Sequence, residues 1–512
     1  METTYIVLIA LTVIYIPLFL YVRFRKKPEK SVLEPYGPCI MIRTKVGIKL
    51  IDRLGRYKRF WHVCGYASRI ITVLLMAYIV GIIILDLILL PAAIGKGGMG
   101  IEYALAIPGL NPMLPIVYGW IGLIVAMVMH ELSHGMQSRA NDISVDSTGL
   151  LYAVVPVGAF VEPNEEEIEK ASRGARMDLY AAGITMNFII AVITFILMFS
   201  MAAGTLHSDY DDSPAIYGYT SGSPFIEYDI PTTSIILTVN GLEVSNIDDF
   251  YSKIDHMGTY TITYCYKNQQ SSGLDVTLGT YVNGIVKGSP IDEHGLEIGD
   301  YIIKLGETNI GTPTSMTDYL KNTNPGDPLH IEYYDSSAAK SGEDPYKSTD
   351  ITLGDNGGKG YVGITTTLSG MSLTTPSIVL NSGINPYYGR DGLSGYVNGT
   401  IGYLANAFNG FSPVPESTQW WYHSSFASDD VFWVLMSLVY WIFWLNIVLG
   451  VTNALPAVPF DGGFLFMGGV EWISEKFIRN EEKRKRVVDT ICSATTYFMI
   501  LALILVLVVI IF

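Results

Sequence analysis

Residues 116–136 read IVYGWIGLIVAMVMHELSHGM, an uncharged apolar run up to Met129 that ends in the motif His130-Glu131-Leu132-Ser133-His134. On a helix, positions i and i+4 share one face, so His130 and His134 can bind one metal ion. Glu131 lies beside them, where it can take a proton from a water molecule at the metal. Ionisable groups inside a membrane segment are costly and rarely kept without a function. The setting therefore favours a metal site over the alternative, in which these side chains only form hydrogen bonds between helices.

Composition and hydropathy predict a polytopic α-helical membrane protein with six transmembrane helices. The chain is 49% hydrophobic and only 16% charged, which is typical of this class. Each predicted span is long enough to cross ~30 Å of hydrocarbon as a helix. The six spans are Thr4–Val22, Ile70–Ile94, Pro115–Met136, Leu179–Met201, Val431–Val451 and Val488–Phe512.

The basic residues predict which side of the membrane each connection faces. The stretch 23–69 is rich in Lys and Arg, and Lys483-Arg484-Lys485-Arg486 lies between the last two spans. By the positive-inside rule both stretches are cytoplasmic, so the N-terminus and the long insert Ala202–Asp430 are predicted outside the cytoplasm. The bias is weak in Gln137–Asp178, where acids outnumber bases. The metal motif then lies towards the cytoplasmic end of the third span.

The net charge of −15 is compatible with a membrane protein, because many of the acidic residues lie in the external insert. An acidic ectodomain favours solubility and says little about substrates. We expect no nucleic-acid partner. Of the four cysteines only Cys265 lies in the insert, so no disulfide framework is expected there.

A catalytic zinc ion has three protein ligands and one open position, so another segment must supply a ligand. The best candidate is Asn453-Ala454-Leu455-Pro456-Ala457-Val458-Pro459-Phe460-Asp461-Gly462-Gly463, at the cytoplasmic end of the fifth span. Two prolines and a Gly-Gly pair break the helix, and a carboxylate lies on the break. Irregular backbone at membrane depth is tolerated where it is buried or lines a wet cavity. Asp461 is the predicted third ligand, and the alternative is a helix-ending turn outside the membrane.

Taken together, these segments resemble the site-2 proteases, which are intramembrane zinc metalloproteases, here of the archaeal type. His130–Gly135 matches the first motif of the family, and Asn453–Gly463 resembles its N-x-x-P…D-G motif. Ala182-Gly183-Ile184-Thr185-Met186-Asn187 is similar to the family's A-G-P-x-x-N element, with Ile184 where a proline is usual. Leu150–Val161 is similar to the strand-forming loop that follows the first motif. An exposed edge there could receive an unwound substrate by strand addition, and the alternative is a re-entrant loop that only packs.

The resemblance implies a role for each residue of the predicted site. It implies Glu131 as the catalytic base and three Zn²⁺ ligands, which are His130, His134 and Asp461. Asn187 and Asn453 could contact the oxyanion or the substrate backbone, and ordinary hydrogen bonding between helices is the alternative. Asp86 in the second span matches no motif and receives no role.

The function implied is an intramembrane zinc endopeptidase of the cell membrane. It would hydrolyse peptide bonds in or near transmembrane segments of membrane-anchored proteins, as in regulated intramembrane proteolysis. The alternative is a catalytically silent scaffold or chaperone that binds transmembrane segments. Glu131 argues against that alternative, because a scaffold needs no catalytic base.

The external insert resembles PDZ domains of the protease-associated type. The resemblance rests on Gly288-Ser289-Pro290-Ile291 and the following Gly295–Ile303. Gly222-Ser223-Pro224 and Ile235–Gly241 look like a degenerate earlier copy, so an internal repeat is predicted. PDZ domains bind extended peptides by β-augmentation, so such peptides are candidate partners. The alternative is a β-rich spacer without a ligand.

The sequence predicts six parts in this order. They are 1–69, the first transmembrane helix and a basic cytoplasmic segment; 70–203, the first part of the membrane metalloprotease core; 204–278, a degenerate PDZ-like domain; 279–368, a PDZ-like domain; 369–430, an extracytoplasmic linker; and 431–512, the second part of the core.

Overall fold

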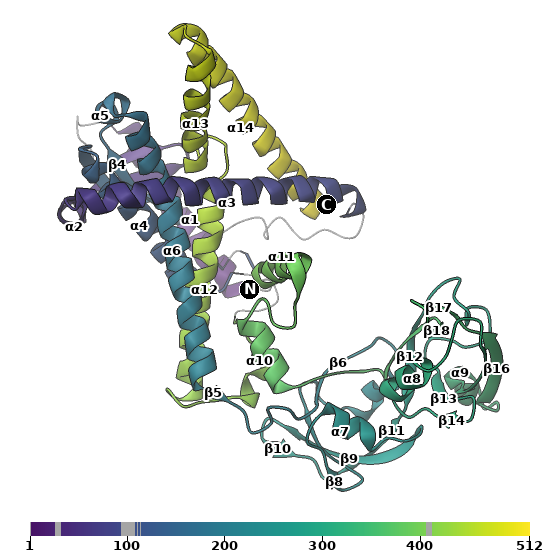
Figure 1. Ribbon diagram of the computed structural model, residues 1–512. Coiled ribbons are helices and arrows are strands. Elements are labelled where there is room, and N and C mark those ends of the chain that lie inside the picture. Colours follow the sequence, from purple (N-terminus) through teal and green to yellow (C-terminus); the bar gives the residue numbers. More distant parts are fainter. Residues whose placement is uncertain are drawn as a thin grey trace. The chain divides into compact units, whose positions relative to one another are not determined.

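The computed structural model describes residues 2–25, 32–93, 108–109, 111–112, 114–405 and 412–511 (Figure 1). Residues 26–31 of the basic segment, Ile94 and Phe512 lie outside the described residues. The chain forms two compact units. The membrane unit comprises Met1–Met201, Leu404–Pro413 and Val434–Phe512, and the insert unit comprises Ala202–Tyr403 and Val414–Trp433.

Five helices of the described chain are long and apolar enough to cross a membrane, and the second to sixth predicted spans fall on them. The first predicted span falls on α1, whose described apolar part, Thr12–Phe24, is shorter. A sixth span and the topology stay predictions. The helices of the membrane part are α1 (Glu2–Phe24), α2 (Ile48–Gly55), α3 (Lys58–Ala93), α4 (Ile116–Ala140), α5 (Glu165–Lys170), α6 (Arg173–Thr205), α12 (Asp429–Asn453), α13 (Asp461–Phe477) and α14 (Glu481–Ile511).

The long helices carry exposed apolar side chains, which a lipid-facing surface requires. On α3, for example, Val73 and Leu74 are exposed. Contact with lipid is favourable for such apolar side chains, whereas contact with water is not. Helices α6 and α12 run side by side (Figure 1), and the rings of Phe195 and Phe443 lie 5.7 Å apart.

A four-stranded antiparallel sheet lies within the membrane unit, in the order β1-β2-β3-β4. Its strands are β1 (Leu33–Tyr36), β2 (Cys39–Thr44), β3 (Val145–Ala153) and β4 (Val155–Pro163). The predicted strand-forming loop is confirmed as the β3–β4 hairpin. The β1–β2 hairpin was not predicted, because its pairing with β3 joins residues more than a hundred positions apart, such as Ile40 and Tyr152. Strand β4 is one edge of the sheet.

The insert unit is rich in short strands. Its elements are β5 (Leu206–His207), β6 (Ala215–Tyr219), η2 (Pro224–Tyr228), β7 (Ile235–Val239), β8 (Leu242–Glu243), α7 (Ile247–Ser252), β9 (Gly258–Tyr266), β10 (Gln269–Gln270), β11 (Leu274–Leu278), β12 (Thr280–Ile285), β13 (Tyr301–Leu305), β14 (Thr308–Asn309), α8 (Pro313–Leu320), β15 (Pro328–Tyr334), α9 (Ser336–Ser341), β16 (Tyr346–Thr352), β17 (Gly354–Asp355), β18 (Gly360–Tyr361), β19 (Ile364–Leu368), β20 (Met371–Thr374), α10 (Pro376–Ile384), α11 (Gly392–Ala405), η4 (Glu416–Trp421) and β21 (His423–Ser424).

Two copies of one arrangement of elements follow each other in this unit. The first copy runs β6, a turn, β7, β8, α7 and β9, and the second repeats it as β12, a turn, β13, β14, α8 and β15. Gly222 and Gly288 occupy the same place in the two turns, both with positive φ, a conformation that glycine adopts without strain. Each copy has its own buried apolar core, around Phe225 and Ile236 in the first and around Ile291 and Ile302 in the second.

The second copy is inserted into the first. Strand β20 follows the second copy in sequence but pairs with β6 of the first, with Met371 opposite Tyr219. Leu368 and Met371 accordingly belong to the first core. The predicted domain limits at 204–278, 279–368 and 369–430 stay predictions, because the compact units do not separate the two copies.

Candidate metal centre

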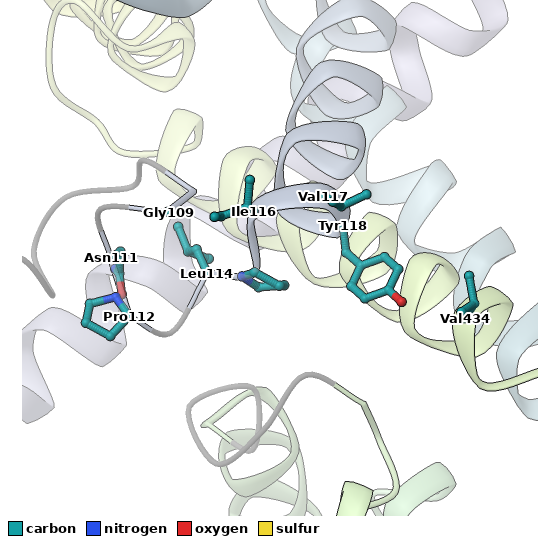
Figure 2. A pocket seen from close by; sticks show the side chains of 9 residues that line it. Gly109, Asn111, Pro112, Leu114, Ile116, Val117, Tyr118 and Val434 are labelled. Carbon is teal, nitrogen blue, oxygen red and sulfur yellow. The ribbon is translucent and has the colours of Figure 1, made fainter. Parts of the chain in front are cut away.

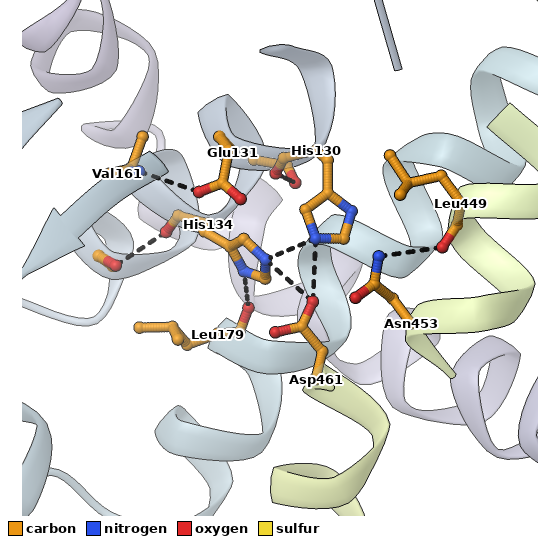
Figure 3. A network of polar contacts seen from close by, with 10 residues as sticks. His130, Glu131, His134, Val161, Leu179, Leu449, Asn453 and Asp461 are labelled. Carbon is orange, nitrogen blue, oxygen red and sulfur yellow. Dashed lines mark hydrogen bonds and ion pairs between the residues drawn. The ribbon is translucent and has the colours of Figure 1, made fainter. Parts of the chain in front are cut away.

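Helix α4 places both histidines of the motif on one buried face. The helix spacing brings His130 Nε2 within 3.1 Å of His134 Nε2, and both side chains are buried. Asp461 Oδ2 lies 3.0 Å from His130 Nε2 and 3.1 Å from His134 Nε2. Three potential ligand atoms therefore meet at one point (Figure 3), although Asp461 is 327 residues from His134.

The broken helix that was predicted to carry Asp461 is present. Helix α12 ends at Asn453 and α13 begins at Asp461. A Cβ on Gly462 would lie 2.3 Å from the carbonyl oxygen of Ala454, and one on Gly463 would lie 2.5 Å from the carbonyl carbon of Ala457. The Gly-Gly pair therefore lets the first turn of α13 pack directly against the break.

The three ligand atoms fit a zinc ion. Zinc bound at about 2.0–2.2 Å in tetrahedral geometry needs donor atoms roughly 3.3 Å apart. The three atoms lie 3.0–3.1 Å apart, close to that spacing. Two imidazoles and one carboxylate are also a ligand set that zinc prefers in catalytic sites.

A hydrogen bond orients His134. Its Nδ1–H donates to the carbonyl oxygen of Leu179 on α6 at 2.7 Å. This bond fixes the tautomer that leaves Nε2 free as a ligand, as contacts behind metal ligands commonly do. His130 Nδ1 is buried and makes no such bond within the described residues.

Gly183 of α6 packs directly against the two histidine rings. A Cβ at this position would lie 2.5 Å from His134 Nε2 and 2.6 Å from His130 Nε2, distances that real Cβ atoms essentially never show. Any larger residue would thus occupy the space that the ligand atoms need. The resemblance included Gly183 in a motif, but its contact with both ligands was not predicted.

Glu131 points to the edge strand of the sheet. The backbone N–H of Val161 on β4 donates to Glu131 Oε2 at 2.9 Å. Because this N–H donates to α4 and β4 is an edge strand, the N–H belongs to the outer edge of β4. The carboxylate therefore lies between the histidine pair and the edge at which an extended peptide could add (Figure 3).

The two predicted asparagines lie in different surroundings. Asn453 donates through Nδ2 to the carbonyl oxygen of Leu449 at 3.0 Å, and Figure 3 draws it beside the cluster. Asn187 is fully buried one helical turn after Gly183, and neither atom of its amide has a partner within the described residues. Asn446 on α12 is also fully buried, with an amide oxygen that has no partner there.

Ion pairs hold the elements that carry the centre. Asp178 precedes Leu179 and pairs with Arg69 of α3 at 2.7 Å, with only 6% of the Asp178 side chain exposed. Gly65 makes room for this carboxylate, since a Cβ there would lie 2.5 Å from Asp178 Cγ. Arg176 of α6 pairs with Glu471 of α13 at 3.1 Å. These contacts were not predicted, because the residue pattern of one helix does not specify the helices that pack against it.

Other polar and hollow features lie away from the centre. Asp86 is half-buried on α3 and does not belong to the metal cluster. A cavity of about 530 Å³ lies at the beginning of α4, lined by Leu114, Val117, Tyr118 and Val434 among others (Figure 2). The motif lies about three turns further along the helix, so this cavity is not part of the centre.

Comparisons with known proteins identify relatives of this chain. An uncharacterised protein of Methanocaldococcus jannaschii is 31% identical over 255 residues, which cover 49% of this chain and 64% of that protein. About a third of that relative therefore lies outside the match. A predicted zinc metalloprotease of Neisseria meningitidis is 22% identical over 415 residues, 69% of this chain and 90% of that protein.

A solved PDZ domain of the SdrC-like protein of Listeria monocytogenes is 26% identical and covers 17% of this chain and 86% of its own, with a TM-score of 0.15. The model of Peptidase family M50 matches residues 118–503, which include the histidine motif and Asp461. The resemblance found in the sequence is confirmed, and the chain belongs to peptidase family M50, the family of the site-2 proteases.

Proposed function

We propose that this protein is an intramembrane zinc endopeptidase that cleaves membrane-anchored proteins in or near their transmembrane segments. The observation that carries the proposal is that Asp461 of α13 meets His130 and His134 on α4, a helix apolar enough to cross a membrane. Soluble substrates do not reach such a site, whereas a transmembrane segment that has partly unwound does.

Each residue has one role in the proposed reaction. His130, His134 and Asp461 hold the zinc ion, which supplies Lewis acidity that polarises a carbonyl and makes a water molecule more acidic. Glu131 takes the proton of the attacking water and passes it to the leaving amine, so that one water is consumed for each peptide bond cleaved. The amides of Asn187 and Asn453 donate hydrogen bonds to the oxyanion or the substrate backbone.

The substrate binds as an added strand along β4. Its free edge carries the Val161 N–H that now donates to Glu131, so a peptide paired there passes beside the catalytic base. In strand addition the affinity comes from main-chain hydrogen bonds, which depend little on the side chains of the peptide. This mode of binding suits a protease that acts on apolar segments of varied sequence.

We place the active site towards the cytoplasmic face of the cell membrane, with the N-terminus and the insert unit outside the cytoplasm. The lysine and arginine bias at both ends of the chain supports this orientation. The PDZ-like copies bind extended peptides or exclude bulky ectodomains, and cleavage then belongs to regulated intramembrane proteolysis.

The direct test compares the wild type with Glu131→Gln, which keeps the size of the side chain and removes the base. Full-length protein loaded with zinc is given single-span test substrates in lipid vesicles, and cleavage is followed on gels. We expect cleavage by the wild type and a loss of about 10²-fold or more in the variant, as for a general base. Glu166→Gln, the same change at an exposed position on α5, should cleave at the wild-type rate.

Equal cleavage by the wild type and Glu131→Gln would refute the proposal that the protein is a peptidase with Glu131 as its catalytic base. If both proteins bind a broad panel of substrates without cleaving them, the alternative function, a scaffold or chaperone that binds transmembrane segments, would be supported instead.

Zinc retention tests the third ligand separately. After dialysis against a weak chelator, elemental analysis should find zinc in the wild type and little in Asp461→Ala. Asp318→Ala, at an exposed position on α8, should retain zinc. Full zinc retention in Asp461→Ala would remove Asp461 from the centre.

A further inference from the structure

Two histidines face each other on a short ribbon outside the metal centre. Strand β5 follows α6 directly, and β21 lies just before α12. The two strands pair antiparallel, with His207 directly opposite His423. The ribbon therefore joins the chain where it leaves α6 to the chain where it enters α12.

The contacts of His423 resemble those of a metal ligand. Its Nδ1 lies 3.0 Å from Asp429 Oδ2, and the backbone N–H of Ser424 donates to Asp429 Oδ1 at 2.9 Å. A carboxylate fixed in this way accepts the Nδ1–H of the imidazole and leaves Nε2 as a free donor to a metal. His423 is thus oriented as zinc-binding histidines commonly are.

The second imidazole is close enough to share an ion. The ring centroids of His207 and His423 lie 6.3 Å apart with an angle of 53° between the rings. Opposite residues on antiparallel strands have Cβ atoms about 4.5–5.5 Å apart, and a metal–nitrogen bond spans about 2.0–2.1 Å. His207 is exposed and His423 is 42% exposed, so a change of side-chain rotamer can turn both Nε2 atoms towards one ion.

We propose that His207 and His423 form a second binding site, for a divalent transition-metal ion, with Asp429 as the group that orients His423. Imidazole ligands suit Ni²⁺, Cu²⁺ and Zn²⁺, and water completes the coordination. The site shares no residue with the candidate catalytic centre and does not depend on the peptidase activity.

A metal ion bound at this site would stabilise the pairing of α6 with α12, two helices next to the candidate catalytic centre. Helix α6 carries Gly183 and Asn187, and α12 leads into the break before Asp461. The two helices already pack together through Phe195 and Phe443. A metal bridge across the ribbon stabilises this pairing at its end, because it binds only the paired form.

Calorimetric titration with NiCl₂ tests the site in full-length, zinc-loaded protein in detergent. We expect one Ni²⁺ to bind per wild-type chain, and binding at least tenfold weaker in His207→Ala and in His423→Ala. The control is His330→Ala, because His330 also lies beside a carboxylate, Asp350 at 2.7 Å, and it should bind as the wild type does. Absence of Ni²⁺ binding, or equal binding by all four proteins, would overturn the proposal.

Electron paramagnetic resonance with Cu²⁺ gives a readout that does not depend on affinity. The wild-type spectrum should show two imidazole nitrogens, and either alanine variant should show one. His134→Ala, which removes a ligand of the candidate catalytic centre, should keep the two-nitrogen signal. The test of the second site is therefore independent of the test of the peptidase proposal. A two-nitrogen signal that persists in His207→Ala and disappears in His134→Ala would assign the copper to the catalytic centre and overturn the proposal.

Discussion

The candidate metal centre and the two copies in the insert unit are organised by different kinds of contact. At the centre, three polar atoms from α4 and α13 lie within 3.1 Å of one another. In the insert unit, each copy is held by a core of many buried apolar side chains. Apolar contacts are interchangeable within limits of volume, whereas a metal ligand has one useful position. The insert should therefore tolerate changes that the centre does not.

The glycines of the two regions also have different roles, a conformational role in the insert unit and a packing role at the centre. Gly222 and Gly288 in the insert serve turns with positive φ. Gly183 is helical, and it is required because two histidine rings approach its Cα.

Gly183→Ala should produce the largest effect, since its new Cβ would displace both histidine rings. We expect zinc retention and cleavage both to be lost, measured by elemental analysis and by substrate cleavage in vesicles. Gly204→Ala on the same helix is the matched control, because a Cβ there meets nothing within 4 Å. Zinc retention by Gly183→Ala at the wild-type level would contradict the close packing.

Ile302→Ala should separate the insert from the centre. Ile302 is fully buried in the second core, and such a truncation costs about 2–5 kcal/mol of folding free energy. Denaturant unfolding followed by fluorescence should show this loss, while zinc retention stays unchanged. Ile298→Ala, at a position that is 61% exposed, should change neither, and a loss of zinc in Ile302→Ala would show that the two regions are coupled.

Asp178→Asn should weaken the centre without removing it. The change breaks the ion pair with Arg69 and loosens the turn whose Leu179 carbonyl orients His134. We expect zinc affinity to fall about tenfold, at the low end for groups behind metal ligands, as measured by competition with a chelator. The control Asp146→Asn, at an exposed position on β3, should keep the zinc affinity of the wild type. An unchanged zinc affinity in Asp178→Asn would mean that the Arg69–Asp178 pair does not support the centre.

Arg176→Gln should have the smallest effect. The pair with Glu471 is about one-third exposed on both sides, and exposed pairs contribute about 0–1 kcal/mol. The free energies of unfolding of Arg176→Gln, Glu471→Gln and the double variant form a cycle that measures the pair directly. A coupling well above 1 kcal/mol would mean that this contact fixes α13, and with it Asp461, more firmly than its exposure suggests.

The sequence predicted the parts that depend on local patterns. The spacing of His130 and His134 predicted a shared helix face, and the prolines and glycines before and after Asp461 predicted the break on which it lies. Apolar runs predicted the five long helices.

The missed features depend on pairing between distant segments. The hairpin Leu33–Thr44 lies in a stretch predicted only as a basic cytoplasmic segment, and its place in the sheet depends on β3, which pairs with it from more than a hundred positions away. Helix α13 lies in a stretch predicted as a cytoplasmic connection. The contact of Gly183 with both histidines and the Arg69–Asp178 pair arise only when helices pack. Local preference does not encode these contacts, because tertiary packing decides them.

The insertion of the second copy into the first within the insert unit sets an order for folding during synthesis. The ribosome makes the chain from its N-terminus, and domains generally fold as units as they emerge. The first copy lacks β20 until residues 279–370, which include the whole second copy, have been synthesised. The copy that is made first is therefore the one completed last, and until then the edge of β6 that β20 will cover stays open to other strands.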